Sequence, residues 1–177
     1  SAEAVSEGQR KFMGTLWNTY AFFVLYADID KYDPSKYDVK KCKLSLMDKW
    51  ALSKLNTLVK TVDEGLAEYK TFETARYIQD YVDELSNWYV RRGRERYWGK
   101  EMTDDKAAAY TTLYTVLVTL SKVIAPYVPF MAESMYGNLV PQFFKDAPIS
   151  VHLCSFPVCD ESFVDAELEK GMEDVLE

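Results

Sequence analysis

The chain has 177 residues, of which 48% are hydrophobic and 28% are charged, and its formal net charge is −7. This length and composition predict one globular domain with a substantial core, and they exclude a disordered chain. No apolar run approaches the roughly 18 residues of a membrane span, and no signal peptide is visible. We therefore expect a cytoplasmic protein that has no contact with a membrane.

The cysteines Cys42, Cys154 and Cys159 are odd in number and lack paired spacing, which argues against a disulfide framework. Together with His152, the single histidine, they are the one set that resembles metal ligands. The chain has no C-x-x-C pair, so we expect no metal site. The simpler interpretation is that these side chains fill gaps in an extended segment.

Positive charge is concentrated in two parts of this acidic chain. Residues 31–60 have a net charge of +5 and residues 91–100 of +4, whereas residues 101–177 have −9. This distribution is typical of a protein that holds nucleic acid along one edge, with acidic faces that limit unspecific contacts. For the lysines of residues 36–60, a merely solvated face and contact with RNA both stay open.

Helical periodicity predicts four long helices in chain order. Ser45 and Asp48 form a capping box at the start of the second helix, and Thr103 is the predicted N-cap of the fourth. The four helices span about residues 7–27, 46–69, 71–98 and 104–124. Long helices with short connections indicate an all-α helical bundle.

Two prolines break this pattern after the fourth helix. A shorter helix is expected over about residues 130–139, followed by an extended strip over residues 149–156. An acidic helix begins at about residue 165 and runs to the end of the chain. We expect this helix to be truncated and residues 1–177 to be a single domain of a larger protein.

The most distinctive segment is residues 85–98, LSNWYVRRGRERYW, which contains four arginines and four aromatic residues. On a helical wheel, Arg92 and Arg96 continue the apolar arc of the preceding turns, while Arg91 and Arg94 lie on a neighbouring face. Arg92 or Arg96 is therefore expected to pair with an acidic side chain inside the bundle. Arg91 and Arg94 are expected to stay accessible, where guanidinium groups suit phosphates or bases.

Candidate acidic partners for the inward-facing arginine are Asp80 and Glu64. Tyr97 and Trp98 follow the last apolar turn, and they either stack on unpaired bases or anchor the helix end on the bundle. Both interpretations stay open. The neighbouring acidic pairs Asp63-Glu64 and Asp104-Asp105 lie on a helix exterior and at a helix start, so they do not indicate acid–base catalysis. His152 has no partner for nucleophilic catalysis. The sequence also has no glycine-rich loop that would bind a phosphate. The residues therefore predict no catalytic site.

Residues 85–98 resemble the L-S-N-W-Y-V-R-R-x-R-x-R-[FY]-W signature of the anticodon-binding domain of isoleucyl-tRNA synthetases. Residues 26–34 resemble the form shared by eukaryotic enzymes and one bacterial branch. Valyl enzymes are similar through Trp-Tyr but lack the four arginines. Further segments that resemble the domain, in the expected order, are residues 16–23, 48–56, 124–133 and 150–157.

This resemblance implies a helical domain that binds the anticodon stem and loop of isoleucine tRNAs. The parent enzyme would use ATP and Mg²⁺ in a catalytic domain of the same polypeptide. The motifs H-I-G-H and K-M-S-K-S are absent here, so we expect this chain to have no cofactor and no catalytic activity alone. The expected tRNA contacts are Arg91, Arg92, Arg94, Arg96, Tyr97, Trp98 and Lys100.

Two alternatives to this function stay open. One is the same domain from a valyl or leucyl enzyme, and the other is a helical protein-interaction module with no role in RNA binding. The second alternative would leave the arginine-rich segment without a purpose. In each case we expect the chain to be a monomer.

Overall fold

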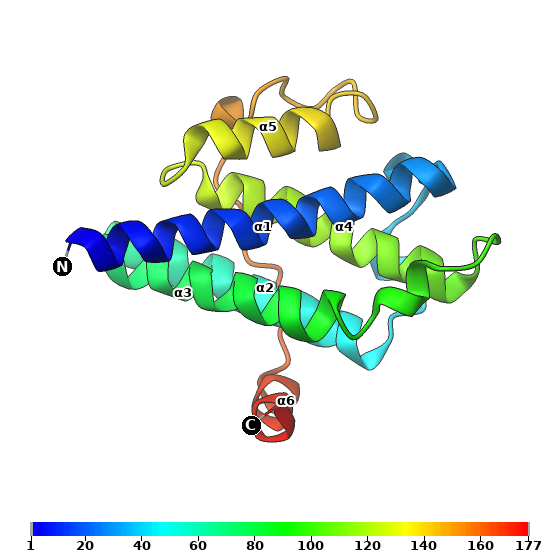
Figure 1. The fold of residues 1–177 in the computed structure, drawn as a ribbon, viewed down its shortest axis with the longest axis horizontal. Helices are drawn as coiled ribbons and strands as arrows, with labels where there is room; N and C mark the ends of the chain where they lie inside the picture. Colours follow the sequence, from blue (N-terminus) through cyan, green and yellow to red (C-terminus); the bar gives the residue numbers. More distant parts are fainter. Residues whose placement is uncertain (1, 177) are drawn as a thin grey trace.

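The computed structural model describes the path of residues 2–176 and the side chains of residues 7–176 (Figure 1). Residues 2–176 contain six α-helices and several short helical turns, and this part of the chain contains no strand. The predicted all-α bundle is confirmed. The α-helices are α1 (Ala2–Asp30), α2 (Leu46–Ala67), α3 (Thr71–Glu84), α4 (Asp104–Ile124), α5 (Pro129–Leu139) and α6 (Ala166–Leu176).

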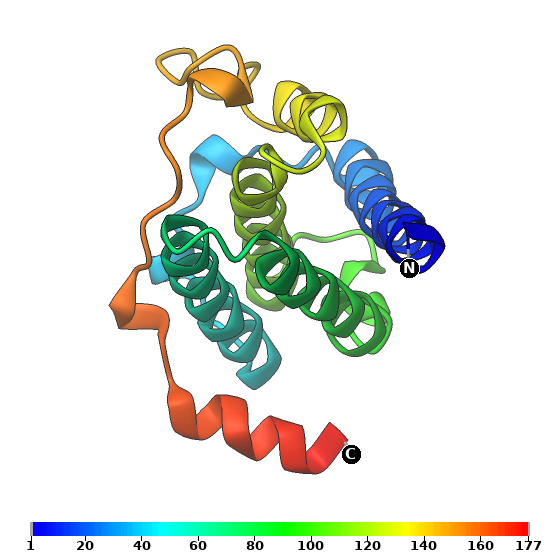
Figure 2. The ribbon, with the colours of Figure 1, turned by 90° about the vertical axis from the view of Figure 1, so that its left-hand side faces the viewer.

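Helix α4 is the central element of the bundle. It packs against α1, α2 and α5, while α3 lies beside α1 and α2 (Figures 1 and 2). Among the described helices, α4 alone is long and apolar enough to cross a membrane, but 72% of its most apolar stretch is buried inside the protein. Its apolar character is therefore explained by the core that surrounds it.

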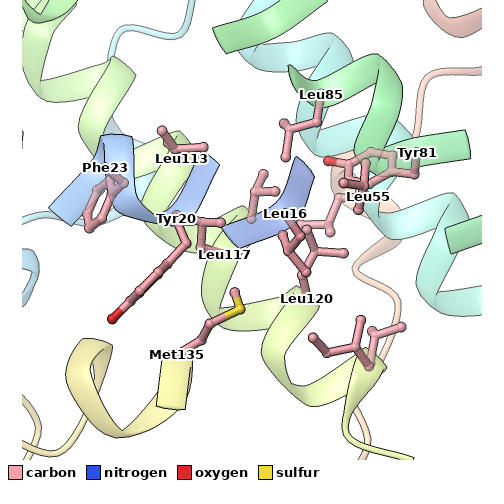
Figure 3. Close-up of a cluster of buried hydrophobic side chains, with 14 of the residues drawn as sticks. Leu16, Tyr20, Phe23, Leu55, Tyr81, Leu85, Leu113, Leu117, Leu120 and Met135 are labelled. Carbon is pink, nitrogen blue, oxygen red and sulfur yellow. The ribbon is translucent and has the colours of Figure 1, made fainter. Parts of the chain in front are cut away.

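One continuous core joins five of these helices (Figure 3). Leu16 of α1 and Leu117 of α4 have no exposed surface, and Met135 of α5 is equally buried. Leu55 of α2 and Leu85, directly after α3, complete the same cluster. The helical periodicity of the sequence therefore reflects the apolar side chains that these helices turn toward the core.

The predicted capping box at the start of α2 is confirmed. The backbone N–H of Asp48 donates to Ser45 Oγ at 3.2 Å, and the backbone N–H of Ser45 donates to Asp48 Oδ2 at 2.9 Å. Asp48 is nevertheless completely buried. A buried carboxylate needs more partners than one backbone N–H, and it receives them from a distant part of the chain.

Arg96 supplies the main partner of Asp48. Its Nη1 and Nη2 donate to Asp48 Oδ1 and Oδ2 at 2.6 and 2.8 Å, a bidentate pair. The Tyr89 hydroxyl donates to the same carboxylate at 2.5 Å, and Arg96 also pairs with Asp105 at the start of α4. The prediction that one arginine turns into the bundle is thus confirmed for Arg96, with Asp48 as its partner in place of Asp80 or Glu64.

These contacts decide the charge state of the cluster. Burial alone would raise the pKa of Asp48, but hydrogen bonds from Arg96, Tyr89 and the Ser45 backbone outweigh it and hold that pKa below its usual value. Burial raises the pKa of the Tyr89 hydroxyl well above its usual value. Asp48 and Arg96 therefore form a buried ion pair that joins α2 to the segment after α3.

The prediction of one continuous third helix to residue 98 is wrong. Helix α3 ends at Glu84, a π-helical segment η3 (Leu85–Val90) follows, and a separate 3₁₀ turn η4 (Arg94–Tyr97) begins beyond Gly93. The backbone N–H of Gly93 donates to the carbonyl of Tyr89. The wider π turn and the break after it allow Arg96 and Tyr97 to turn inward, a nonlocal requirement that helical periodicity does not register.

The C-terminal region agrees with the sequence only in part. The expected extended strip over residues 149–156 contains a 3₁₀ turn, η5 (Val151–Leu153), whose Val151 is buried. The expected acidic helix is present as α6, and it lies against α2 (Figure 2). Glu169 of α6 accepts hydrogen bonds from Ser53 and Thr57 of α2 at 2.7 and 2.9 Å.

Replacement of Arg96 by alanine is expected to destabilise the domain strongly. The change leaves a buried carboxylate without its cation, which costs about 3–5 kcal/mol and lowers the melting temperature by about 6–20 °C for a chain of this size. Arg94→Ala is the matched control, because Arg94 is exposed and should shift melting by only about 1–2 °C. Equal melting temperatures for the two variants, measured by circular dichroism, would show that the pair contributes nothing.

The stability of the domain is also expected to depend on the charge of Asp48. Its pKa is lowered by folding, so its contribution is complete above the unfolded-state pKa of about 3.9 and is lost as the pH falls through the folded-state value. The difference in unfolding free energy between the parent and Asp48→Asn should therefore shrink from about pH 6 to about pH 2. Urea unfolding of both proteins, with the exposed Asp63→Asn as control, measures it; a constant difference would contradict this assignment.

Candidate RNA-binding surface

Four cations around the π turn are exposed and have no acidic partner within the described part of the chain. They are Arg91, Arg92, Arg94 and Lys100. The ion pairs found among residues 7–176 include none of these four side chains. Neighbouring like charges without counter-charges repel one another, so this surface favours an anionic ligand.

The π turn directs the first arginines of this group. The backbone N–H of Arg91 donates to the carbonyl of Ser86, five residues earlier. The guanidinium of Arg92 lies 4.1 Å from the centre of the Trp88 ring, a cation–π contact that orients it. Trp88 is half-buried, so the outer face of its ring is free to contact this exposed arginine.

A hollow of about 200 Å³ lies between α1 and the π turn. The Arg94 guanidinium is 5.8 Å from the centre of the Phe22 ring on α1, so this arginine spans the two elements. The lining residues are Asn18, Thr19 and Phe22 of α1 together with Ser86, Asn87, Val90, Arg91 and Arg94.

The hollow is lined by apolar, hydrogen-bonding and positively charged side chains together. Phe22 and Val90 provide apolar surface, while Asn18 and Asn87 each offer both hydrogen-bond donors and an acceptor. The two guanidinium groups at its edge bring positive charge. Apolar surface, amide groups and cations together suit an unstacked base with its flanking phosphates.

The structure separates the residues that the sequence grouped as contacts. Trp98 is 56% exposed, as a stacking residue must be, whereas Tyr97 is only 3% exposed. The Tyr97 hydroxyl donates to the carbonyl of Ala109 at 3.2 Å, and its ring packs edge-on against Tyr110. Tyr97 therefore anchors the segment on the bundle, and its ring is out of reach of a ligand at the surface.

Arg96 is also less available than the other arginines. The resemblance includes it among the expected tRNA contacts, but its guanidinium is occupied by Asp48 and Asp105, as the helical wheel predicted for one inward-facing arginine. Its side chain retains 17% exposure. The accessible part of the predicted contact set is thus Arg91, Arg92, Arg94, Trp98 and Lys100.

The lysine-rich region contributes less free charge than its composition indicates. Lys40, Lys43, Lys54 and Lys60 each pair with an acidic side chain. The pair between Lys43 and Asp104 ties the loop before α2 to the start of α4 at 3.0 Å. Four of the seven lysines in residues 36–60 are therefore already paired within the protein.

Sequence reasoning missed the contribution of α1 to this surface. Asn18 and Phe22 line the hollow, yet they are more than 60 residues from Asn87 in the sequence. One signal was available, since Asn18 is a polar residue on the side of α1 opposite the buried Leu16 and Tyr20. A polar position on a core helix is too common to have identified a site.

The residues set aside as metal ligands do not come together. Within the described residues, no group of three His, Cys, Asp or Glu side chains is close enough to hold a metal ion. Cys42, Cys154 and Cys159 are free thiols. His152 Nε2 lies 3.5 Å from Glu133 Oε2, and the same oxygen accepts a hydrogen bond from the Ser150 hydroxyl.

Comparison with known proteins matches residues 48–177 to the family described as the anticodon-binding domain of tRNA ligase. The isoleucine–tRNA ligase of Clostridium novyi is 58% identical over 98% of this chain. The enzymes named isoleucine–tRNA ligase from Bacteroides thetaiotaomicron and Dehalococcoides mccartyi are 46% and 47% identical over 97% and 99% of the chain.

The chain spans 17%, 15% and 17% of the lengths of these three relatives, respectively. The sequence resemblance is confirmed, and the valyl, leucyl and protein-interaction alternatives are not favoured by these relatives. The family match covers well over half of the residues, including nearly all of α2, the π turn and α4. The chain therefore belongs to the family of anticodon-binding domains of tRNA ligases.

Proposed function

We propose that this chain binds the anticodon stem and loop of an isoleucine tRNA. It would position the tRNA for aminoacylation by a catalytic domain of the same parent polypeptide, in the cytoplasm, with ATP and Mg²⁺ acting only in that domain. The observation that carries the proposal is that Arg91 and Arg94, exposed and without an acidic partner, line the hollow between α1 and the π turn. Arg92 and Lys100 add two further exposed cations in the same segment of the chain.

The proposed division of labour follows from the chemistry of each group. Arginines bind phosphates in bidentate fashion and so fix the register of the RNA, without reading its sequence. The amides of Asn18 and Asn87 face an occupant of the hollow and would read the edge of an unstacked base. Trp98 would provide a stacking surface, which every base tolerates.

This function requires no chemistry from the chain itself. Transfer of the amino acid would depend on it, because the acceptor end of the tRNA is placed by the grip on the anticodon. Activation of isoleucine by ATP would not depend on it. This asymmetry distinguishes residues that bind tRNA from residues that only maintain the fold of the parent enzyme.

Removal of Arg91 and Arg94 together is expected to weaken tRNA binding. Each charged contact contributes about 1–3 kcal/mol, so loss of even one weakens binding roughly 5- to 150-fold. In the parent enzyme, kcat/KM for tRNA should fall while isoleucine-dependent pyrophosphate exchange stays near the parent value. Lys145→Ala, an exposed cation on the loop after α5, is the matched control and should change neither quantity.

Two other outcomes would count against the proposal. If exchange and transfer fall together in the Arg91 and Arg94 double variant, the residues support the fold of the enzyme. If neither changes, the RNA contacts another surface.

Binding by the isolated chain should weaken as salt rises. Each phosphate contact releases counterions, and with four available cations the slope of log K against log salt should be no steeper than about −4. The double variant lacking Arg91 and Arg94 should reduce that slope by about 1.4–1.8. Titration of an anticodon stem–loop RNA between about 50 and 200 mM salt measures both values, and a salt-independent affinity would refute the electrostatic part of the proposal.

A further inference from the structure

The loop that joins η4 to α4, residues 98–103, carries the most exposed aromatic side chain of the proposed RNA surface. Trp98 is 56% exposed and Met102 is 37% exposed, and Lys100 lies between them. A loop of this kind is ordinarily mobile. Here the backbone on each side of Trp98 is fastened by a buried or half-buried cation.

The N-terminal side of the loop is held by the η4 turn. The backbone N–H of Trp98 donates to the carbonyl of Glu95 at 3.1 Å. Arg96, which lies within the same turn, is fixed by its bidentate pair with Asp48. The position at which the chain enters residue 98 is therefore set by the core of the bundle.

The C-terminal side is held by Lys106. Its Nζ donates to the carbonyl of Gly99 at 2.8 Å and pairs with Asp30 Oδ2, also at 2.8 Å. The side chain of Lys106 is 2% exposed, and Tyr110 donates a further hydrogen bond to Asp30. A buried ammonium group is expensive unless its donors are satisfied, so this cluster strongly favours the arrangement that offers it the Gly99 carbonyl.

Gly99 independently favours the same loop conformation. Its φ is +89°, a value that side-chain-bearing residues rarely adopt. A Cβ at Gly99 would meet nothing within 4 Å, so space alone does not require glycine there. Backbone conformation is the requirement, and it turns the Gly99 carbonyl toward Lys106.

We propose that Lys106 is a positioning residue for RNA binding, which acts through the Gly99 carbonyl to present Trp98 to an unpaired base. This inference rests on the proposed function. Lys106 itself is buried and has no access to a ligand. Its effect is preorganisation, since a loop already fixed in its bound conformation loses less entropy when it binds.

Gly99→Ala tests the inference without disturbing the buried cluster directly. The substitution strains the loop at positive φ, and a strain of this kind lowers the population of the binding-competent loop by roughly 5-fold or more. Affinity for an anticodon stem–loop RNA carrying an isoleucine anticodon should fall by the same factor. Gly137→Ala on α5, where a Cβ also meets nothing within 4 Å, is the control and should bind like the parent.

A double-mutant cycle then asks whether the effect passes through Trp98. Trp98→Ala should weaken binding roughly 5- to 150-fold. In that background, Gly99→Ala and Lys106→Met should add less than about 2-fold, because coupled residues are not additive. In fluorotryptophan-labelled protein without RNA, the Trp98 resonance should shift or broaden in Gly99→Ala, a change that a purely stabilising role for the loop would not require.

The outcomes separate this inference from the proposed function. If Trp98→Ala weakens binding but folded Gly99→Ala and Lys106→Met proteins bind like the parent, the positioning role is wrong and the function stands. Additive effects with Trp98→Ala also overturn the positioning role. If the Arg91 and Arg94 double variant binds RNA as well as the parent does, the proposed function itself fails. The Lys106→Met result is interpreted only if the circular dichroism spectrum of this variant matches that of the parent. If it does not match, the Gly99→Ala result alone tests the positioning role.

Discussion

The buried carboxylate of Asp48 is the constraint on which the arginine-rich end of the bundle depends. It closes the capping box of α2 through Ser45, accepts the Tyr89 hydroxyl from the π turn and binds Arg96 from the turn beyond it. A fully buried charge tolerates no vacant partner position. The start of α2 and the segment after α3, which are distant in sequence, are therefore held together at one point. Because both Tyr89 and Arg96 are bonded there, the backbone between them has little freedom left.

The same constraint divides the arginines by function. Because Arg96 is drawn inward after a π turn and a short break, Arg91, Arg92 and Arg94 are left on the outside of a tight bend. An uninterrupted α-helix would have placed the four side chains along about one and a half turns. Arg96 thus contributes to stability, while the other three arginines stay exposed and two of them, Arg91 and Arg94, line the hollow beside α1.

The helices and their buried faces could be predicted from the sequence, because periodicity and capping are local properties. The box of Ser45 and Asp48 was visible for that reason, and the inward direction of an arginine followed from the helical wheel. The π turn and the burial of Tyr97 depend on contacts with α2 and α4, so no local sequence pattern predicted them. Asn18 was missed on the same ground, since the hollow exists only when α1 meets the π turn.

The partly buried Arg96 and the buried Lys106 lie on either side of the loop of this surface that carries an exposed tryptophan. Hydrophobic side chains of similar size would often stabilise such positions equally well or better. The cations supply directional bonds to a carboxylate in one case and to a backbone carbonyl in the other. Directional bonds select one backbone path among many of similar compactness, whereas apolar contacts select only burial. If this surface binds an RNA loop as we propose, the directional bonds would hold its side chains in fixed register with the bases and phosphates.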